Sequence, residues 1–138
     1  MSKLITILWT MVIVLSYMWG QPVMASAPVQ EKQEVKILSV QETIHYFATL
    51  YGAHEEELLM VANCESKFTP TARGDHGLAY GVMQFHEATF NRYTDMFGES
   101  LDYYSYNDQI RLASWMFAQH PESKTAWTCW TKNKNRFT

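Results

Sequence analysis

Glu65, in the stretch NCESKF at residues 63–68, is the residue whose type and position best suit acid–base chemistry. It follows a helical stripe of Leu58, Val61 and Ala62, which lie seven, four and three residues before it. Burial on such a face disfavours the charged form of a carboxyl group, and a protonated carboxylic acid can act as a general acid. Cleavage of a glycosidic bond needs such an acid, because the leaving oxygen must be protonated. From the spacing alone, a structural glutamate bonded to nearby backbone is the favoured interpretation.

Other catalytic and metal-binding patterns do not occur in the sequence. His54-Glu55-Glu56 lacks the second histidine of the zinc protease motif H-E-x-x-H, and there is no G-x-S-x-G motif. Cys64 and Cys129 are the only cysteines, and without a C-x-x-C pair they do not suggest a zinc site. We therefore predict no metal and no cofactor. The formal net charge of -3 argues against a nucleic-acid binder that relies on a basic surface.

The first residues have the three-part layout of a secretory signal peptide. Lys3 supplies a positive start, and residues 4–19 form an uncharged apolar run that is followed by small residues. We predict a signal peptide at residues 1–25 with cleavage after Ala25, and therefore export to the cell wall, the periplasm or the medium. The apolar run is slightly short for a membrane span, and an uncleaved membrane anchor is the alternative.

Export changes the expectation for the two cysteines. In an oxidising compartment, one disulfide between Cys64 and Cys129 is the default expectation. This bond would close most of the domain into a loop, for which chain entropy predicts a stabilisation of about 4 kcal/mol.

Two helices are expected before and at Glu65. The first begins at the S-x-x-E capping box that starts at Ser39, and it ends at Gly52. The second begins near His54 and carries three glutamates in its first turn, which we expect to be solvated. It should end just after Glu65, because Thr69-Pro70 disfavours a helix.

A loop and two further helices are expected to complete the domain. Residues 70–82 carry three glycines and a proline, which predicts a loop or short hairpin in front of the helix end. A helix is predicted over residues 87–97, and another one is predicted to be capped by Asn107 and ended by Pro121. No stretch alternates long enough to predict a larger sheet, so the domain should be small and mainly helical.

Several short motifs follow one another along the chain. They are Glu65-Ser66 at a helix end, the GVMQ segment at residues 81–84, the pair Thr89-Phe90, and the later segments NDQIRLASWMF and WTC. In this order they resemble the lysozyme-like superfamily, and within it the SLT-type lytic transglycosylases and the resuscitation-promoting factors of bacterial cell walls. The resemblance covers residues 38–130.

The resemblance implies a mainly α, lysozyme-like α+β fold, with the Gly-rich loop or short hairpin in front of the catalytic helix. It implies a domain at residues 38–130, preceded by a linker at residues 26–37 and followed by a polar tail at residues 131–138. In the resuscitation-promoting factors the last cysteine bridges to the one just before the catalytic acid, which matches Cys64 and Cys129.

The resemblance also implies roles for the site residues. Glu65 would be the single general acid/base, and Ser66 would hold its geometry by hydrogen bonding. Gln84 would contact the sugar beside the scissile bond. The other expected substrate-binding positions are Tyr80 and Gly81, which would shape the cleft, and Thr89, which would support it. Among the aromatic residues, Trp127 is the first candidate to stack on a sugar, although aromatic residues in a small helical domain are more often part of the core.

The activity implied by the resemblance is cleavage of the β-1,4 bond between N-acetylmuramic acid and N-acetylglucosamine in peptidoglycan glycan strands, with a lytic transglycosylase as the first hypothesis. A lysozyme-type hydrolase, in which water attacks, is an alternative that a second carboxylate would favour. Asp75 is the best-placed candidate for that carboxylate, although a turn residue is the favoured interpretation. The histidines nearby, His76 and His86, are expected to be exposed. A non-catalytic peptidoglycan-binding domain of the same fold is a further alternative.

Overall fold

The computed structural model describes residues 37–137. The expected signal peptide at residues 1–25 and all but the last residue of the expected linker at 26–37 lie outside this range. Within residues 37–137, no helix combines the length and the apolar character that a membrane crossing requires.

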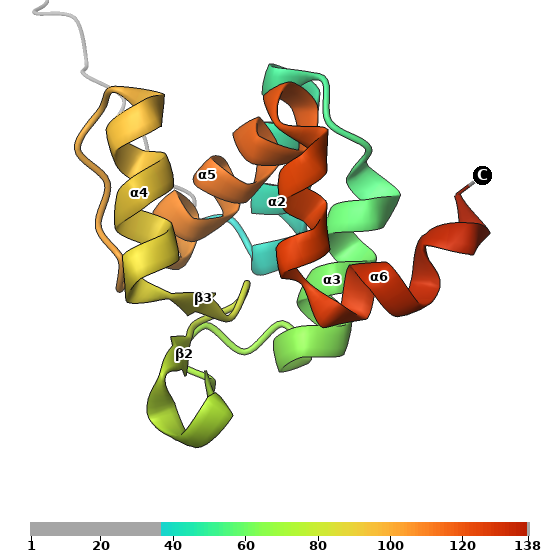
Figure 1. Ribbon diagram of the computed structural model, residues 1–138. Coiled ribbons are helices and arrows are strands. Elements are labelled where there is room, and N and C mark those ends of the chain that lie inside the picture. Colours follow the sequence, from blue (N-terminus) through green and yellow to red (C-terminus); the bar gives the residue numbers. More distant parts are fainter. Residues whose placement is uncertain (1–36, 138) are drawn as a thin grey trace, which may run out of the picture. The chain divides into compact units, whose positions relative to one another are not determined.

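The described domain is mainly helical, with a small antiparallel sheet beside the helices (Figure 1). The sheet has the order β1-β2-β3, and Tyr80 pairs with Arg73 on one side and with Phe85 on the other. The helices are α2 (Val40–Tyr51), α3 (Glu55–Ser66), α4 (Glu87–Phe97), α5 (Tyr106–Gln119) and α6 (Thr128–Asn133), the strands are β1 (Arg73–Gly74), β2 (Ala79–Tyr80) and β3 (Phe85–His86), and the short 3-10 turns are η1 (Asp75–Gly77), η2 (Pro121–Ala126) and η3 (Lys134–Arg136). The expected loop or hairpin is thus a sheet of two-residue strands.

Helix α2 begins and ends where the sequence predicted. The hydroxyl of Ser39 accepts a hydrogen bond from the Glu42 backbone N–H at 3.2 Å, and the Ser39 N–H donates to the Glu42 carboxylate at 2.8 Å. Gly52 closes the helix in the left-handed conformation, with a φ of 75°. Helix α2 packs mainly on α5, and Ile44 and Ile110 are fully buried between these elements and the rest of the core.

Helix α5 starts slightly earlier than expected, so the prediction that Asn107 caps it is wrong. Ser105 is the cap, and its hydroxyl accepts a hydrogen bond from the Asp108 backbone N–H at 3.3 Å. Serine three residues before an acidic residue is itself a capping pattern, and it places Asn107 inside the first turn.

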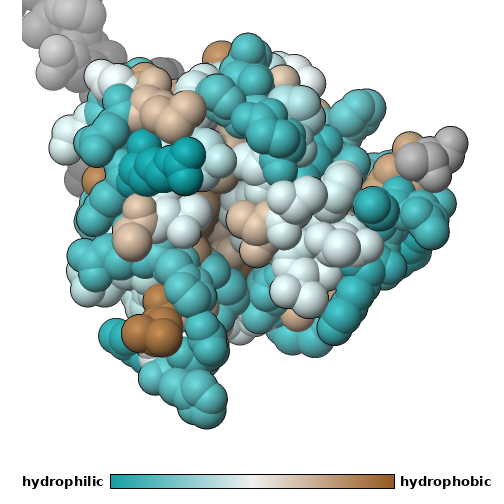
Figure 2. All heavy atoms as spheres, viewed as in Figure 1, coloured by the Kyte–Doolittle hydropathy of each residue, from teal (hydrophilic) through white to brown (hydrophobic). Residues whose placement is uncertain are grey.

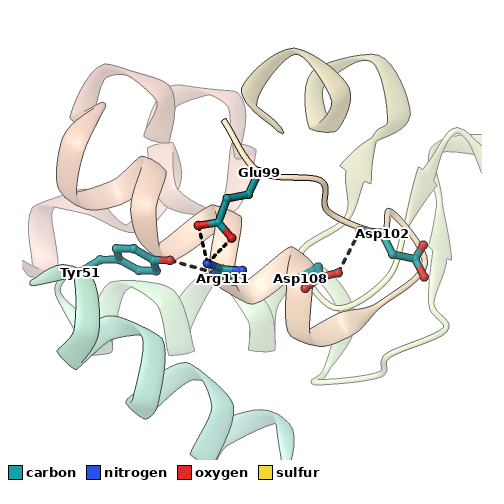
Figure 3. Close-up of polar contacts among 5 residues, drawn as sticks. All are labelled: Tyr51, Glu99, Asp102, Asp108 and Arg111. Atoms are coloured by element: carbon teal, nitrogen blue, oxygen red, sulfur yellow. Dashed lines mark hydrogen bonds and ion pairs between the residues drawn. The ribbon is translucent and has the colours of Figure 1, made fainter. Parts of the chain in front are cut away.

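The connector between α4 and α5 is held in place by side chains of α5 (Figure 3). The Arg111 guanidinium donates to both carboxylate oxygens of Glu99, at 2.9 and 2.8 Å, and to the Tyr51 hydroxyl of α2 at 3.0 Å. The Asp108 carboxylate accepts a hydrogen bond from the Asp102 backbone N–H at 2.9 Å. Because Arg111 and Asp108 are one turn apart on α5, this helix fixes the connector at two points, near its start at Glu99 and near its middle at Asp102.

Glu57 is buried, which corrects the expectation that the acidic first turn of α3 is solvated. Its side chain pairs with the Lys124 ammonium group of η2 and accepts a hydrogen bond from the Trp130 indole N–H of α6 at 3.3 Å. Glu57 lies four residues before Val61, so it shares the buried face of α3. The pair fastens the C-terminal segment to the helix that carries Glu65.

The predicted disulfide between Cys64 and Cys129 is confirmed. It joins the end of α3 to α6, with 6.0 Å between the two Cα atoms. Helix α6 continues to Asn133, whose side-chain amide donates to the Cys129 carbonyl oxygen at 2.9 Å. The expected polar tail therefore begins inside a helix.

Candidate active site

Glu65 lies in the last turn of α3 and is partly exposed. Its Oε1 atom accepts a hydrogen bond from the Cys129 backbone N–H at 3.3 Å, and its Oε2 atom has no hydrogen-bond partner within residues 37–137. The N–H groups in the first turn of a helix lack partners inside that helix, and Glu65 satisfies one of them in α6. Oε1 is therefore engaged by α6, whereas Oε2 is the oxygen that remains for other contacts.

The chain turns sharply after Glu65 and returns to cover the helix end. Lys67 and Phe68 both adopt left-handed backbone conformations, with φ of 54° and 60°. Ser66 is buried, and its hydroxyl lies 3.0 Å from the Ala62 carbonyl oxygen and 2.8 Å from the Val82 carbonyl oxygen. Ser66 therefore holds the following loop on the helix, and it positions Glu65 through the backbone.

Gln84 closes the loop over residues 81–84. Its side-chain amide donates to the carbonyl oxygens of Ala72, at 3.1 Å, and Gly81, at 2.7 Å. The backbone of Gln84 is left-handed, with a φ of 51°. The Gln84 amide nitrogen thus ties the loop to the segment before β1, and Gln84 also lines the cleft pocket described below.

A hollow crosses the face of the molecule between the side that carries β3 and α4 and the side that carries α3 and α6 (Figure 2). A small pocket of about 50 Å³ brings together three of the expected residues, Gln84, Thr89 and Trp127, with Phe85, His86 and Ala126. Glu65 is bonded to the same C-terminal segment, at Cys129. We call this region the cleft.

Trp127 belongs mainly to the core. Only 4% of its surface is exposed, and its indole N–H donates to the Met83 carbonyl oxygen at 2.7 Å. Its ring packs on Phe85 and Phe117, with centroid distances of 5.2 and 5.3 Å. Trp127 lines the cleft pocket with this small exposed part, which leaves little area for a stacked sugar.

Gln109 is an important residue that the sequence analysis missed. It is fully buried on α5, where its amide group donates to the carbonyl oxygens of Tyr80, at 3.2 Å, and Tyr103, at 2.8 Å, and its Oε1 atom accepts from the Met83 N–H at 3.3 Å. It lies four residues before Ala113 on the buried stripe of the helix, a spacing that could have identified it. Gln109 fastens the loop that follows β2 to the centre of the domain.

The sequence of residues 42–125 matches the family described as the transglycosylase SLT domain. The chain belongs to this family. The match runs from α2 into η2, includes Glu65, Gln84 and Thr89, and stops before Trp127 and Cys129. No curated protein and no solved structure matches the chain.

Membership of the SLT family agrees with the observed architecture, which is a mainly α, lysozyme-like α+β domain with one disulfide. The family is one of lytic transglycosylases, enzymes that cleave glycosidic bonds in peptidoglycan. Within residues 37–137, no group of three or more histidine, cysteine or acidic side chains is arranged to hold a metal ion.

Gly81 and Tyr80 do not line the cleft pocket of this SLT domain. Tyr80 is buried and lines a second, larger pocket. A Cβ atom on Gly81 would lie 2.2 Å from the Gln109 amide nitrogen, so the close approach that this glycine permits is to Gln109. Neither residue is part of the lining of the pocket that Gln84, Thr89 and Trp127 share, although the Gly81 carbonyl oxygen accepts a hydrogen bond from the Gln84 side chain.

Replacement of Gly81 by alanine is expected to lower the free energy of unfolding by about 3 kcal/mol, from left-handed backbone strain and overpacking together. Gly98 supplies a matched control, because its φ of 81° is close to the 82° of Gly81 but no atom beyond its two chain neighbours lies within 4 Å of the point that a Cβ atom would occupy there. Gly98→Ala should cost only the strain, about 1 kcal/mol. Urea unfolding of both variants measures the difference, and equal losses would show that the contact with Gln109 has no energetic weight.

Asp75 lies in the turn η1, in agreement with the favoured turn interpretation. Its carboxylate is 3.1 Å from the Nε2 atom of His86, which is exposed as expected and lines the cleft. Both Asp75 and His76 have left-handed backbones, with φ of 45° and 54°. The Asp75–His86 pair joins the hairpin turn to the start of α4.

Proposed function

We propose that the protein is an exported peptidoglycan lytic transglycosylase in which Glu65 is the single general acid/base. The observation that carries this proposal is the arrangement of Glu65 in an SLT domain, with Oε1 bonded to the Cys129 N–H and Oε2 without a hydrogen-bond partner in the described part of the chain. Such a carboxyl group is oriented by one oxygen and can exchange a proton with a substrate through the other.

The reaction would proceed in two steps. In the first, Glu65 donates the proton on Oε2 to the oxygen that bridges N-acetylmuramic acid and N-acetylglucosamine, and an oxocarbenium-like state develops at the muramoyl C1 atom. In the second, the muramoyl 6-hydroxyl attacks C1 while the Glu65 carboxylate accepts the hydroxyl proton. The product is a 1,6-anhydromuramoyl end, and Glu65 returns to its protonated form.

The surroundings of Asp75 support transglycosylation over hydrolysis. A hydrolase of the lysozyme type uses a second carboxylate as nucleophile or as base for the attacking water. The Asp75 carboxylate lies 3.1 Å from the Nε2 atom of His86, and Asp75 is part of the turn η1 between β1 and β2. An attack by the sugar's own hydroxyl does not need this carboxylate.

Two features support export. The apolar run at residues 4–19 has the length and flanks of a signal peptide. The Cys64–Cys129 disulfide is a type of bond that persists in oxidising compartments outside the cytosol. Peptidoglycan is found in the same compartments.

The products of digestion test the proposal. Purified protein is incubated with peptidoglycan, and the released fragments are analysed by mass spectrometry. We expect anhydromuramoyl ends, which are lighter than the corresponding reducing ends by the mass of one water molecule, because no water is added. Reducing ends would identify a hydrolase, and binding to peptidoglycan without release of fragments would identify a non-catalytic binding domain.

A further inference from the structure

A second pocket, of about 300 Å³, adjoins the cleft and has no role in the bond cleavage proposed above. We call it the tyrosine pocket. Its walls come from the β1–β2 hairpin, the start of α4 and the connector between α4 and α5. His86 lines both this pocket and the cleft, so the two share a wall. A substituent of a glycan strand bound in the cleft could therefore extend into the tyrosine pocket.

Three tyrosines form an aromatic cluster in the wall of the tyrosine pocket. The Tyr104 ring lies 5.1 Å from the rings of both Tyr80 and Tyr103, and these two rings are 5.7 Å apart. Tyr80 is buried, whereas Tyr104 is 61% exposed. An exposed aromatic ring on a buried aromatic base offers a fixed apolar face to the aliphatic part of a ligand.

Two opposite charges complete the lining. Arg73 and Glu87 both face the tyrosine pocket, and neither forms an ion pair with another residue in the range 37–137. The Arg73 guanidinium lies over the Tyr80 ring, 5.1 Å from its centroid. Burial raises the pKa of Tyr103, the Glu87 carboxylate raises it further, and Arg73 lowers it. Both charges therefore act on the same phenol, and both are available to a ligand.

The pocket walls are held in position before any ligand arrives. The Tyr103 hydroxyl donates to the Phe85 carbonyl oxygen of β3 at 2.8 Å, and its own carbonyl oxygen accepts from Gln109. The connector that carries Tyr103 and Tyr104 is fastened at Glu99 and Asp102 by α5 (Figure 3). A preorganised pocket loses less conformational entropy when it binds a ligand.

We propose that the tyrosine pocket binds a zwitterionic side-chain end within a peptide, where one carbon carries both a carboxylate and an ammonium group. Arg73 pairs with the carboxylate, Glu87 pairs with the ammonium group, and Tyr104 covers the aliphatic chain that leads to them. In peptidoglycan, a peptide stem that contains diaminopimelic acid has such an end. The assignment of the ligand to a stem peptide rests on the proposed function, whereas the zwitterion chemistry rests on the pocket alone.

Binding of a stem peptide tests the proposal without any need for cleavage. The probe is an N-acetylated stem tripeptide that ends in diaminopimelic acid, titrated into the isotope-labelled protein and followed by NMR. We expect saturable shifts at the tyrosine pocket. Acetylation of the side-chain amine or amidation of the neighbouring carboxylate should each weaken binding about tenfold, because each removes one charge-assisted contact. Unchanged affinity after both modifications would overturn the proposal.

Matched substitutions locate the site. Arg73→Gln and Glu87→Gln should each weaken binding of the tripeptide about tenfold. Arg92→Gln and Glu56→Gln remove the same charges from exposed positions outside the pocket and should leave binding unchanged. Equal affinities in Arg73→Gln and in the wild type, or shifts that map elsewhere, would contradict the assignment. Free diaminopimelate that binds as tightly as the tripeptide would identify a free amino acid as the ligand and overturn the stem assignment.

Cleavage assays keep this inference separate from the proposed function. On intact peptidoglycan, Arg73→Gln should raise KM and leave kcat unchanged, whereas on glycan strands stripped of stems by an amidase it should behave as the wild type. If neither substrate is cleaved while the tripeptide still binds, the proposed function fails and the zwitterion site stands. If both substrates are cleaved and Arg73→Gln has no effect on either one, the inference fails alone.

Discussion

Replacement of Glu65 by glutamine is expected to lower the rate of glycan release from peptidoglycan by about 100-fold to 10,000-fold, the range that general acid–base catalysis supplies. Glutamine keeps the size of the side chain and an oxygen that accepts the Cys129 N–H. Its amide group cannot donate a proton to the bridging oxygen or accept one from the muramoyl hydroxyl. The initial rate of anhydromuramoyl product formation measures the loss.

Glu56→Gln is the matched control for this prediction, because Glu56 is an exposed glutamate on the same helix, in its first turn. It should retain wild-type activity, and Glu65→Gln should retain the circular dichroism spectrum and binding to peptidoglycan of the wild type. A Glu65→Gln variant that is still as active as Glu56→Gln would remove Glu65 from the chemistry. The first hypothesis for the mechanism would then be lost, although the fold would be unaffected.

The helix ends of this domain could be predicted from the sequence because short-range signals determine them. The capping box at Ser39, the left-handed Gly52 and the break before Pro70 act within a few residues of the ends that they define. The one wrong cap, Asn107, was a choice between two capping residues that are two positions apart, Ser105 and Asn107. Such errors move a boundary and leave the packing of the helix unchanged.

The buried polar groups were harder to predict because their partners are distant in the sequence. Glu57 pairs with Lys124, 67 residues away, and no local pattern links these positions. Gln109 bonds to Tyr80 and Met83 through contacts that exist only after the hairpin folds onto α5. Periodicity alone could have marked both residues as buried, since each lies on the apolar face of its helix, but it could not name their partners.

The candidate site also contains features that the sequence predicted and contacts that only the structure shows. The resemblance to lytic transglycosylases predicted roles for Glu65, Gln84 and Thr89, and all three lie within the residues that match the SLT family; their roles stay predictions. Ser66 and Trp127 donate hydrogen bonds to the backbone of Val82 and Met83, and Gly81 lies against Gln109, so these contacts hold the surrounding loop in place. Sequence motifs record positions that a family shares. They do not distinguish residues that touch a substrate from residues that hold those substrate-contacting residues in place.

Removal of the Cys64–Cys129 disulfide by the double substitution Cys64→Ser, Cys129→Ser is expected to lower the free energy of unfolding by about 4 kcal/mol, the chain-entropy value for the 65-residue separation. This is a large share of the stability of a small domain. The midpoint of urea unfolding, compared with that of the wild type under oxidising conditions, measures the loss. The wild type with a reducing agent should behave like the double variant, and the reducing agent should not change the double variant further.

The same bond is expected to affect catalysis, because Cys129 supplies both the disulfide sulfur and the N–H group that holds Oε1 of Glu65. At a temperature where the double variant is still folded, release of α6 should weaken this hydrogen bond and lower kcat more than it changes KM. The ion pair between Glu57 and Lys124 and the bond from Trp130 still fasten the C-terminal segment, so the loss should be smaller than that in Glu65→Gln. An unchanged kcat in the folded double variant would show that the disulfide stabilises the domain without positioning its acid.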